Sequence, residues 1–323
     1  MIVRWGLESL AEACAEARVS SPLLVASPRW DSLQLPVAIA GRWQEVPSER
    51  IADAGAAAAD ADGILAVGGG SAIDLGKAIS AEKSLPLVSV PTTYAGAEWT
   101  SYFGIRDPDR LMRGGGGGAH PAAIVYEPKL TLGLSAETTV GTAMNALAHC
   151  AEALYAEGHN PAADEHALAG ARLISDWLPQ VVSDPQDLEG RAELLLGACH
   201  AGAALGGSML ALGHAMAQAV GGRYGLPHGT LNGISLPVAL RFNSAYAPDA
   251  VRRFGEAIGA PGDPAGRVEE LAALAGPGRL RDLGVRKEDL AALALDAAQR
   301  GGNRANPKPA SPQEIEQLLR ELY

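Results

Sequence analysis

Short apolar runs and longer helical stretches alternate along the first third of the chain. The apolar runs are Leu23–Val25, Pro36–Ala40, Ile64–Val67 and Leu87–Val90, and each has the length of a buried strand. Strands that alternate with helices predict a parallel sheet. After about Thr138 the chain is rich in Ala, Leu and Glu at helical spacing and almost lacks strand-like runs. The pattern therefore predicts an α/β domain over residues 1–136 and an all-α domain over residues 137–323.

Three consecutive glycines, Gly68, Gly69 and Gly70, follow the third apolar run and precede Ser71 and an amphipathic stretch. This order indicates a strand, a glycine turn and a helix. Glycine lets the backbone approach a pyrophosphate closely, and the unpaired N–H groups at the start of the helix face an anion. The spacing matches neither G-x-G-x-x-G nor a nucleotide-hydrolase loop, which ends in Lys and Ser or Thr. We interpret this segment as a candidate cofactor-binding turn.

A further buried run ends in Thr92 and Thr93. Open α/β sheets bind ligands at the carboxyl ends of their parallel strands, where these hydroxyls would lie beside a cofactor. Capping of a turn by the two threonines is an equally good local interpretation. On the helix after the glycines, we interpret Asp74 and Lys77 as a surface pair or a cap contact, and contact with the cofactor is the lesser alternative for Lys77.

Asn145 and His149 are four residues apart in a helical stretch, so their side chains lie on one face, one turn apart. His214 and His228 follow in glycine-containing segments. One Asn with three His suits a metal ion or a polar substrate. A single His beside Ala and Leu is more often a satisfied core or surface residue, and that role stays the alternative for each one alone. Together the four predict a site.

Composition and charge exclude several classes of partner. A net charge of −11 and a pI near 5.1 argue against nucleic acid and anionic membranes. The first residues lack the charged and apolar regions of a signal peptide, and no apolar stretch reaches the roughly 18 residues of a transmembrane helix. We therefore expect a cytoplasmic protein. The three cysteines are scattered, which indicates neither a disulfide framework nor a zinc knuckle.

In order and spacing, the glycine turn, the Thr pair, Asn145 with His149, and the two later histidines resemble the iron-containing alcohol dehydrogenase superfamily. Four segments are most similar to its maleylacetate reductases: Pro91–Glu98, Val125–Leu132, Met144–Tyr155 and Gly221–His228. The resemblance implies a nicotinamide-binding α/β domain, a helical domain, an active site in the cleft between them, and a homodimer. The cofactor contacts that it implies are Gly68, Gly69, Gly70, Ser71, Thr92 and Thr93.

The alcohol dehydrogenases of this superfamily hold a divalent metal with one Asp and three His, and the metal polarises the substrate oxygen. Here Asn145 stands at the Asp position, and a neutral amide weakens the affinity for a hard divalent ion. Maleylacetate reductases also have Asn there and are regarded as working without metal, so we expect no tightly held metal. Any bound metal would use Asn145, His149, His214 and His228. Without one, these four are the expected catalytic residues.

The resemblance implies that a reduced nicotinamide delivers hydride to a carbon–carbon double bond conjugated with a ketone. Maleylacetate, an oxo-acid of aromatic degradation, would thereby become 3-oxoadipate. An imidazole aimed at the developing enolate would stabilise it or supply the proton. NADH is the expected cofactor on family grounds. NADPH is the second candidate, because the first buried run lacks the acidic residue that would repel a 2′-phosphate.

Three positions depart from the family pattern. Gln218 stands where the family carries another His, Ala97 replaces a serine, and Gly114–Gly118 replace a basic turn. Five consecutive glycines make regular structure unexpected, and we favour a solvated connection over a flexible lid. The departures leave a related oxo-acid as the substrate, a metal-dependent alcohol dehydrogenase or aldehyde reductase, and a non-redox relative of the fold as alternatives.

Overall fold

The computed structural model describes residues 1–276 and 278–323. The chain divides into two compact units. The N-terminal unit consists of Met1–Thr93 and Ala97–Gly133, and the C-terminal unit consists of Tyr94–Gly96 and Leu134–Tyr323. The short segment Tyr94–Gly96 therefore follows the Thr pair in sequence but belongs to the helical unit.

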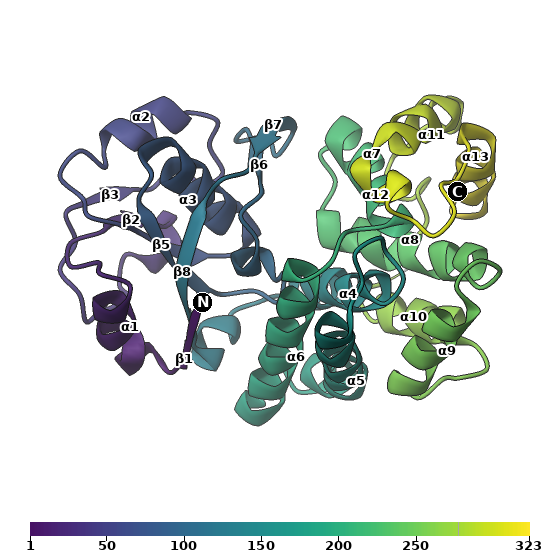
Figure 1. The fold of residues 1–323 in the computed structure, drawn as a ribbon, viewed down its shortest axis with the longest axis horizontal. Helices are drawn as coiled ribbons and strands as arrows, with labels where there is room; N and C mark the ends of the chain where they lie inside the picture. Colours follow the sequence, from purple (N-terminus) through teal and green to yellow (C-terminus); the bar gives the residue numbers. More distant parts are fainter. Residues whose placement is uncertain (277) are drawn as a thin grey trace. The chain divides into compact units, whose positions relative to one another are not determined.

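A six-stranded sheet forms the centre of the N-terminal unit, in the order β1-β8-β5-β4-β2-β3 with every neighbouring pair parallel (Figure 1). Its strands are β1 (Ile2–Trp5), β2 (Leu23–Val25), β3 (Gly41–Trp43), β4 (Ile64–Gly68), β5 (Pro86–Pro91) and β8 (His120–Tyr126). The two central strands β4 and β5 are apolar along almost their whole length because helices cover both faces of the sheet. The parallel α/β fold class expected from the alternating pattern is confirmed.

Helices cover the two faces of this sheet. Because side chains alternate along each strand, each face of the sheet contributes to its own hydrophobic core. Helix α1 (Leu10–Glu16) packs on one face against Leu24, Leu65 and Val88. Helices α2 (Ile51–Ala56) and α3 (Gly70–Lys83) pack on the other face against strand residues of opposite parity. Short 3₁₀ turns complete the unit: η1 (Leu7–Ser9), η2 (Pro28–Trp30), η3 (Ala97–Trp99) and η4 (Pro128–Thr131).

Two local expectations are wrong. Pro36–Ala40 is not a strand; Val37 and Ile39 pack against the core from an irregular segment, and the edge strand begins at Gly41. The glycine run is partly regular, because Gly114–Gly116 end β7 (Met112–Gly116), which pairs antiparallel with β6 (Phe103–Arg106). Glycine is needed there, since a Cβ on Gly115 would lie 2.8 Å from the carbonyl oxygen of Phe103.

Lys77 is buried, so its interpretation as half of a surface pair is also wrong. Its side chain is 1% exposed, and Nζ lies 3.0 Å from Asp74 Oδ1 and 2.7 Å from the carbonyl oxygen of Tyr102. Asp74 also accepts the backbone N–H of Gly104 at 3.2 Å. Pairing and hydrogen bonds offset the cost of burying the charge. The two residues thus fasten the β6–β7 hairpin to α3.

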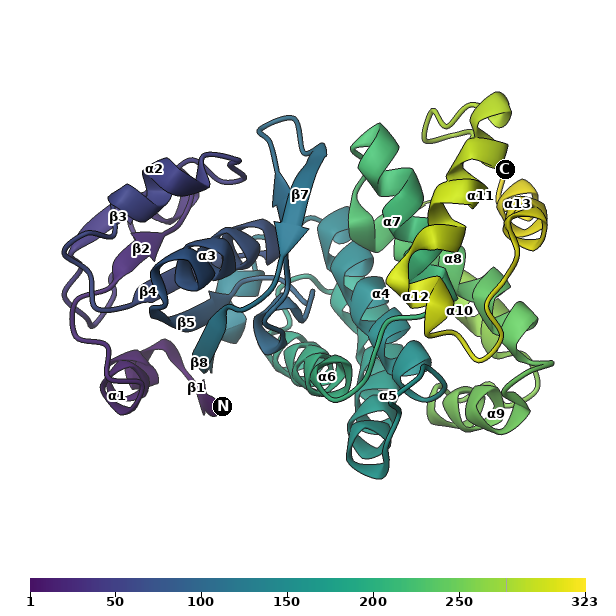
Figure 2. The same cartoon turned by 45° about the horizontal axis from the view of Figure 1, so that its top comes forward.

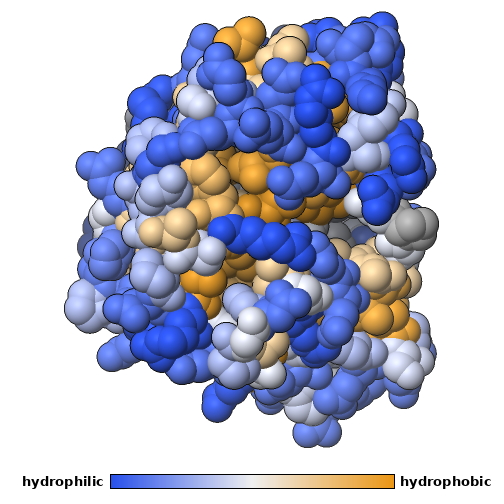
Figure 3. Space-filling model, turned by 90° about the vertical axis from the view of Figure 1, so that its right-hand side faces the viewer, coloured by the Kyte–Doolittle hydropathy of each residue, from blue (hydrophilic) through white to orange (hydrophobic). Residues whose placement is uncertain are grey.

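Beyond the N-terminal unit the described chain is helical, as the spacing of Ala, Leu and Glu predicted (Figure 2). The helices are α4 (Ala136–Ala153), α5 (Pro161–Ser183), α6 (Leu188–Gly206), α7 (Leu212–Tyr224), α8 (His228–Asn243), α9 (Pro248–Ala257), α10 (Pro264–Ala273), η5 (Lys287–Asp289), α11 (Leu290–Gln299), α12 (Gly301–Arg304) and α13 (Pro312–Glu321). Helix α4 is almost wholly buried, and helices α7, α8, α11 and α13 share one apolar core. None of the described helices has the length and apolar character needed to cross a membrane. The face in Figure 3 is mostly hydrophilic, with hydrophobic residues in its hollow.

Candidate functional site

The glycine turn and the Thr pair meet at the carboxyl ends of two neighbouring strands. Gly68 ends β4, Gly69 precedes α3 as its N-cap, and the Thr92 N–H donates to the Gly68 carbonyl oxygen at 3.0 Å. A Cβ on Gly69 would lie 2.9 Å from Thr93 Cγ2, which is too close for an ordinary contact. Glycine at position 69 therefore lets the turn approach the Thr93 side chain. The structure brings all six expected cofactor contacts to one edge of the sheet.

This edge fits a dinucleotide pyrophosphate. Gly68 has a φ of +151°, which L side chains rarely adopt, and no side chain caps the start of the 14-residue helix α3 within the described chain. The N–H groups of Gly70 and Ser71 stand in the first turn of that helix, where backbone donors have no partner within the helix. An uncapped helix N-terminus beside a glycine-lined strand end is a ready anion site.

In the C-terminal unit, three helices bring the expected imidazoles together. Helix α4 carries Asn145 and His149, α7 carries His214, and His228 begins α8. The His149 and His214 rings stack with centroids 4.8 Å apart, and the centroids of His214 and His228 are 5.6 Å apart. Burial lowers the pKa of His149 well below its ordinary value, and the other two imidazoles lower it further. His149 is therefore neutral near pH 7.

A buried carboxylate that the sequence reasoning missed orients His214. Glu152 is fully buried on α4, and its Oε2 lies 2.7 Å from His214 Nδ1. The same carboxylate accepts the backbone N–H groups of Ala211 at 2.6 Å and His214 at 3.0 Å, at the start of α7. Because an ionised carboxylate only accepts, Nδ1 of His214 carries the proton. Nε2 of His214 is buried and without a partner among the described residues.

Glycine makes this arrangement possible, since a Cβ on Gly213 would lie 2.9 Å from Glu152 Oε1. The helix N-terminus and two N–H groups stabilise the buried negative charge. One sequence signal was available: Glu152 follows His149 by three residues on a helix, and therefore shares its face.

Asn232 is the second residue that was missed, and it joins Asn145 to His228. Asn145 Nδ2 donates to the Ala95 carbonyl oxygen at 2.8 Å, and its Oδ1 accepts Asn232 Nδ2 at 2.5 Å. Asn232 Nδ2 also lies 3.1 Å from His228 Nε2. A carboxylate at position 145 would face the Ala95 carbonyl without a proton to donate. Both polar atoms of Asn145 are thus engaged within the protein.

Close helix crossings hold the cluster in place. A Cβ on Gly229, next to His228, would lie 2.1 Å from the Gly141 carbonyl oxygen, so α4 and α8 touch through their backbones. On the other side of His149, a Cβ on Gly96 would lie 3.5 Å from His149 Nδ1. That nitrogen is buried and has no hydrogen-bond partner among the described residues. His149 Nε2 lies 3.5 Å from Asn145 Nδ2.

The donor set does not fit a tightly held hard divalent ion. Such ions prefer anionic oxygen, whereas Asn145 is neutral and its oxygen is already bound by Asn232. The buried carboxylate of Glu152 is already occupied by three donors. Within residues 1–276 and 278–323, no three His, Cys, Asp or Glu side chains are arranged to hold a metal ion.

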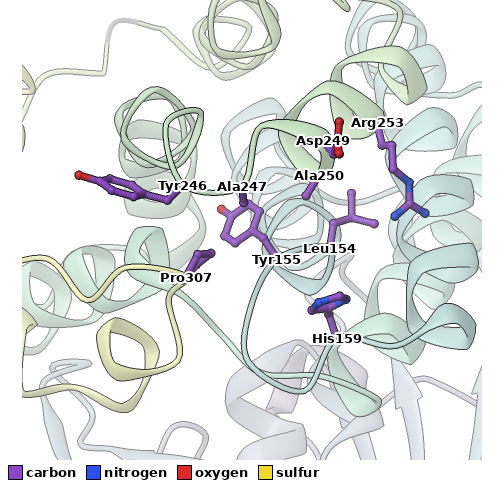
Figure 4. A pocket seen from close by; sticks show the side chains of 9 residues that line it. All are labelled: Leu154, Tyr155, His159, Tyr246, Ala247, Asp249, Ala250, Arg253 and Pro307. Carbon is purple, nitrogen blue, oxygen red and sulfur yellow. The ribbon is translucent and has the colours of Figure 1, made fainter.

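Two other features bear on the candidate site. Gln218 lies on α7 one turn after His214 and supplies an amide where the family carries an imidazole. A separate pocket of about 310 Å³ opens elsewhere in the C-terminal unit (Figure 4). It is lined by Leu154, Tyr155, His159, Tyr246, Ala247, Asp249, Ala250, Arg253 and Pro307. None of the four expected catalytic residues is among them, so this pocket is not the candidate site.

Comparison with known proteins gives a consistent result along the whole chain. The family model "Fe-containing alcohol dehydrogenase family, C-terminal" matches residues 139–323, and "Iron-containing alcohol dehydrogenase" matches residues 6–128. A maleylacetate reductase of Burkholderia cepacia is 40% identical over 81% of this chain and 74% of its own length. That of Pseudomonas sp. (strain P51) is 33% identical over 98% and 93%. The crystal structure of maleylacetate reductase from Agrobacterium tumefaciens superposes with a TM-score of 0.89 at 30% identity, covering 100% of this chain and 95% of that one.

Proposed function

The chain belongs to the iron-containing alcohol dehydrogenase family, and we propose that it reduces the conjugated double bond of maleylacetate, or of a closely related oxo-acid, to give 3-oxoadipate or its analogue. It is an NAD(P)H-dependent oxidoreductase. The identity to maleylacetate reductases over most of the chain supports this substrate class. The observation that carries the proposal is Asn145, whose amide is engaged on both sides. Beside it, two imidazoles each have a buried nitrogen without a hydrogen-bond partner among the described residues.

The N-terminal unit binds the cofactor. Gly68–Ser71 would hold the pyrophosphate, with Thr92 and Thr93 beside this turn on the neighbouring strand. A reduced nicotinamide, when bound, supplies the hydride. We propose NADH as the preferred cofactor on the likeness to the reductase group, with NADPH as the second candidate.

The C-terminal unit holds the substrate oxygen and moves the proton. Hydride addition to the alkene carbon distal to the ketone places negative charge on the ketone oxygen, as an enolate. Neutral His149 carries one ring N–H, and we assign this buried donor to that oxygen. Glu152 supports positive charge on His214, whose Nε2 then gives a proton to the carbon beside the ketone.

We further propose that the reaction needs no bound metal ion. The imidazole donors take the part that a Lewis acid plays in the alcohol dehydrogenases of the family. Gln218 does not interrupt this scheme, because the proton comes from His214 and not from position 218.

Steady-state reduction assays test the proposal. Maleylacetate, 2-oxo acids and small aldehydes are each offered with NADH and with NADPH, and cofactor oxidation is followed by absorbance. Turnover of maleylacetate to 3-oxoadipate is expected. Turnover of aldehydes alone, and only after zinc or iron is added, would instead identify a metal-dependent alcohol dehydrogenase. A protein that binds no reduced nicotinamide would be a non-redox relative.

A further inference from the structure

A second pair of imidazoles lies in the C-terminal unit, apart from the Asn145 cluster. His166 on α5 and His200 on α6 approach with their Nδ1 atoms 2.8 Å apart and their ring centroids 5.1 Å apart. His166 is exposed and His200 is half-buried, so the pair is open to solvent. Helices α5 and α6 run side by side in both ribbon views (Figures 1 and 2).

Close packing of the two helices fixes the spacing of this pair. Gly170 lies one turn after His166, and a Cβ there would lie 2.9 Å from the Gly197 carbonyl oxygen and 3.1 Å from the Ala201 backbone nitrogen. Ala201 directly follows His200. The two backbones therefore touch beside the histidines, and neither helix can slide without a clash. The packing therefore fixes the distance between the two Nδ1 atoms, which suits a ligand that binds both nitrogens.

The spacing suits two adjacent ligands of one transition-metal ion. With metal–nitrogen bonds of about 2.0–2.1 Å, an angle of about 90° at the metal places the nitrogens about 2.8–3.0 Å apart, whereas a tetrahedral angle places them about 3.3–3.4 Å apart. The observed 2.8 Å corresponds to the right angle. Square-planar and tetragonal coordination by nitrogen is typical of Cu²⁺ and Ni²⁺. We propose that His166 and His200 form a two-histidine site for one divalent transition-metal ion, with Cu²⁺ bound most tightly.

Metal binding at this pair requires a change of tautomer in one of the two rings. In the hydrogen-bonded pair one Nδ1 carries the proton that the other accepts. To bind the metal ion, the donor ring changes tautomer: the proton leaves Nδ1, Nε2 takes a proton from solvent, and both Nδ1 lone pairs are then free for the metal ion, with no net release of protons.

Water completes the coordination sphere, because no third His, Cys, Asp or Glu joins the pair among residues 1–276 and 278–323. Two protein ligands give an exchangeable site and not a permanent structural one. The affinity order Cu²⁺ above Ni²⁺ and Zn²⁺ follows from the general preference of nitrogen sites.

Calorimetric titration of the untagged full chain with Cu²⁺ tests the site. The variants are His166→Gln, His200→Gln and, as the matched control, His159→Gln, which changes an exposed histidine on the loop before α5. We expect one Cu²⁺ bound by the wild type, affinity at least about tenfold lower in either pair variant, and unchanged affinity in the control. Circular dichroism checks that each variant is folded, which the exposure of His166 favours.

A His214→Ala variant separates this site from the Asn145 cluster. If Cu²⁺ binding survives His214→Ala and is lost in His166→Gln, the metal is on α5 and α6 as proposed. If His166→Gln binds Cu²⁺ as the wild type does, or if only His214→Ala loses it, the proposal is overturned. These outcomes do not depend on the reductase activity, so a failure of one proposal is distinguishable from a failure of the other.

Discussion

Replacement of Glu152 by glutamine should separate catalysis from cofactor binding. Glu152 offers two acceptor oxygens to three buried donors, the N–H groups of Ala211 and His214 and the Nδ1–H of His214. Glutamine has one oxygen, so at least one donor then faces an amide NH₂. A hydrogen bond to a charged group contributes about 1.5–3 kcal/mol, and an unsatisfied buried donor costs a similar amount.

That loss converts directly into rates and melting temperatures. If the full loss of about 1.5–3 kcal/mol applies to the transition state, kcat falls by roughly 10–150-fold. For a unit of this size the same loss lowers Tm by about 3–12 °C. The KM for NADH should stay unchanged, because the glycine turn belongs to the other unit.

Steady-state kinetics with maleylacetate and a thermal melt measure both effects. Glu157→Gln, which changes an exposed carboxylate shortly after α4, is the matched control and should behave as the wild type. Wild-type kcat and Tm in Glu152→Gln would show that the carboxylate neither orients His214 nor supports its proton, and would refute the assignment.

Three further substitutions test other parts of the structure. Gly229→Ala places a Cβ 2.1 Å from the Gly141 carbonyl oxygen. Because overpacking costs about 1–3 kcal/mol, Tm in a thermal melt should fall. An unchanged Tm would contradict the close crossing of α4 and α8. Gly69→Val fills the space before Thr93 and should raise the KM for NADH about tenfold, while Gly262→Ala, in open space, should not. Hydrogen bonds from Lys308 and Ser311 lower the pKa of Glu314 to about 2, so its stabilising effect is present above about pH 4.5 and is lost as the pH falls toward 2. The difference in urea midpoint between wild type and Glu314→Gln should therefore shrink over that interval, and a constant difference would refute the pairing.

The features that follow from local periodicity were predictable. The alternation of apolar runs identified β2, β4 and β5, and the four-residue spacing placed Asn145 and His149 on one face of α4. Both signals need only the repeat of a strand or a helix. Strand β3 was misplaced because an irregular edge segment with alternating burial has the same pattern as a strand.

The features that depend on distant contacts were not predictable. Lys77 looked like a surface residue on its helix, and only the return of the chain at Thr100 and Tyr102 buries it. Gly115 looked unstructured, yet the close approach of Phe103 requires glycine in that strand. Glu152 acts through partners at least 59 residues away in sequence, and Asn232 reaches Asn145 across 87 residues, so spacing along the chain does not reveal these contacts. Burial and partner identity are tertiary properties.

The most direct test of the proposed function is NADH oxidation by protein that has been treated with a chelator and dialysed. Maleylacetate is the substrate, the residual metal content is measured, and the product is identified. Turnover to 3-oxoadipate at the same rate before and after chelation is the expected result. Loss of turnover on chelation, with recovery on adding zinc or iron, would contradict a reaction carried by the imidazoles of His149 and His214 alone.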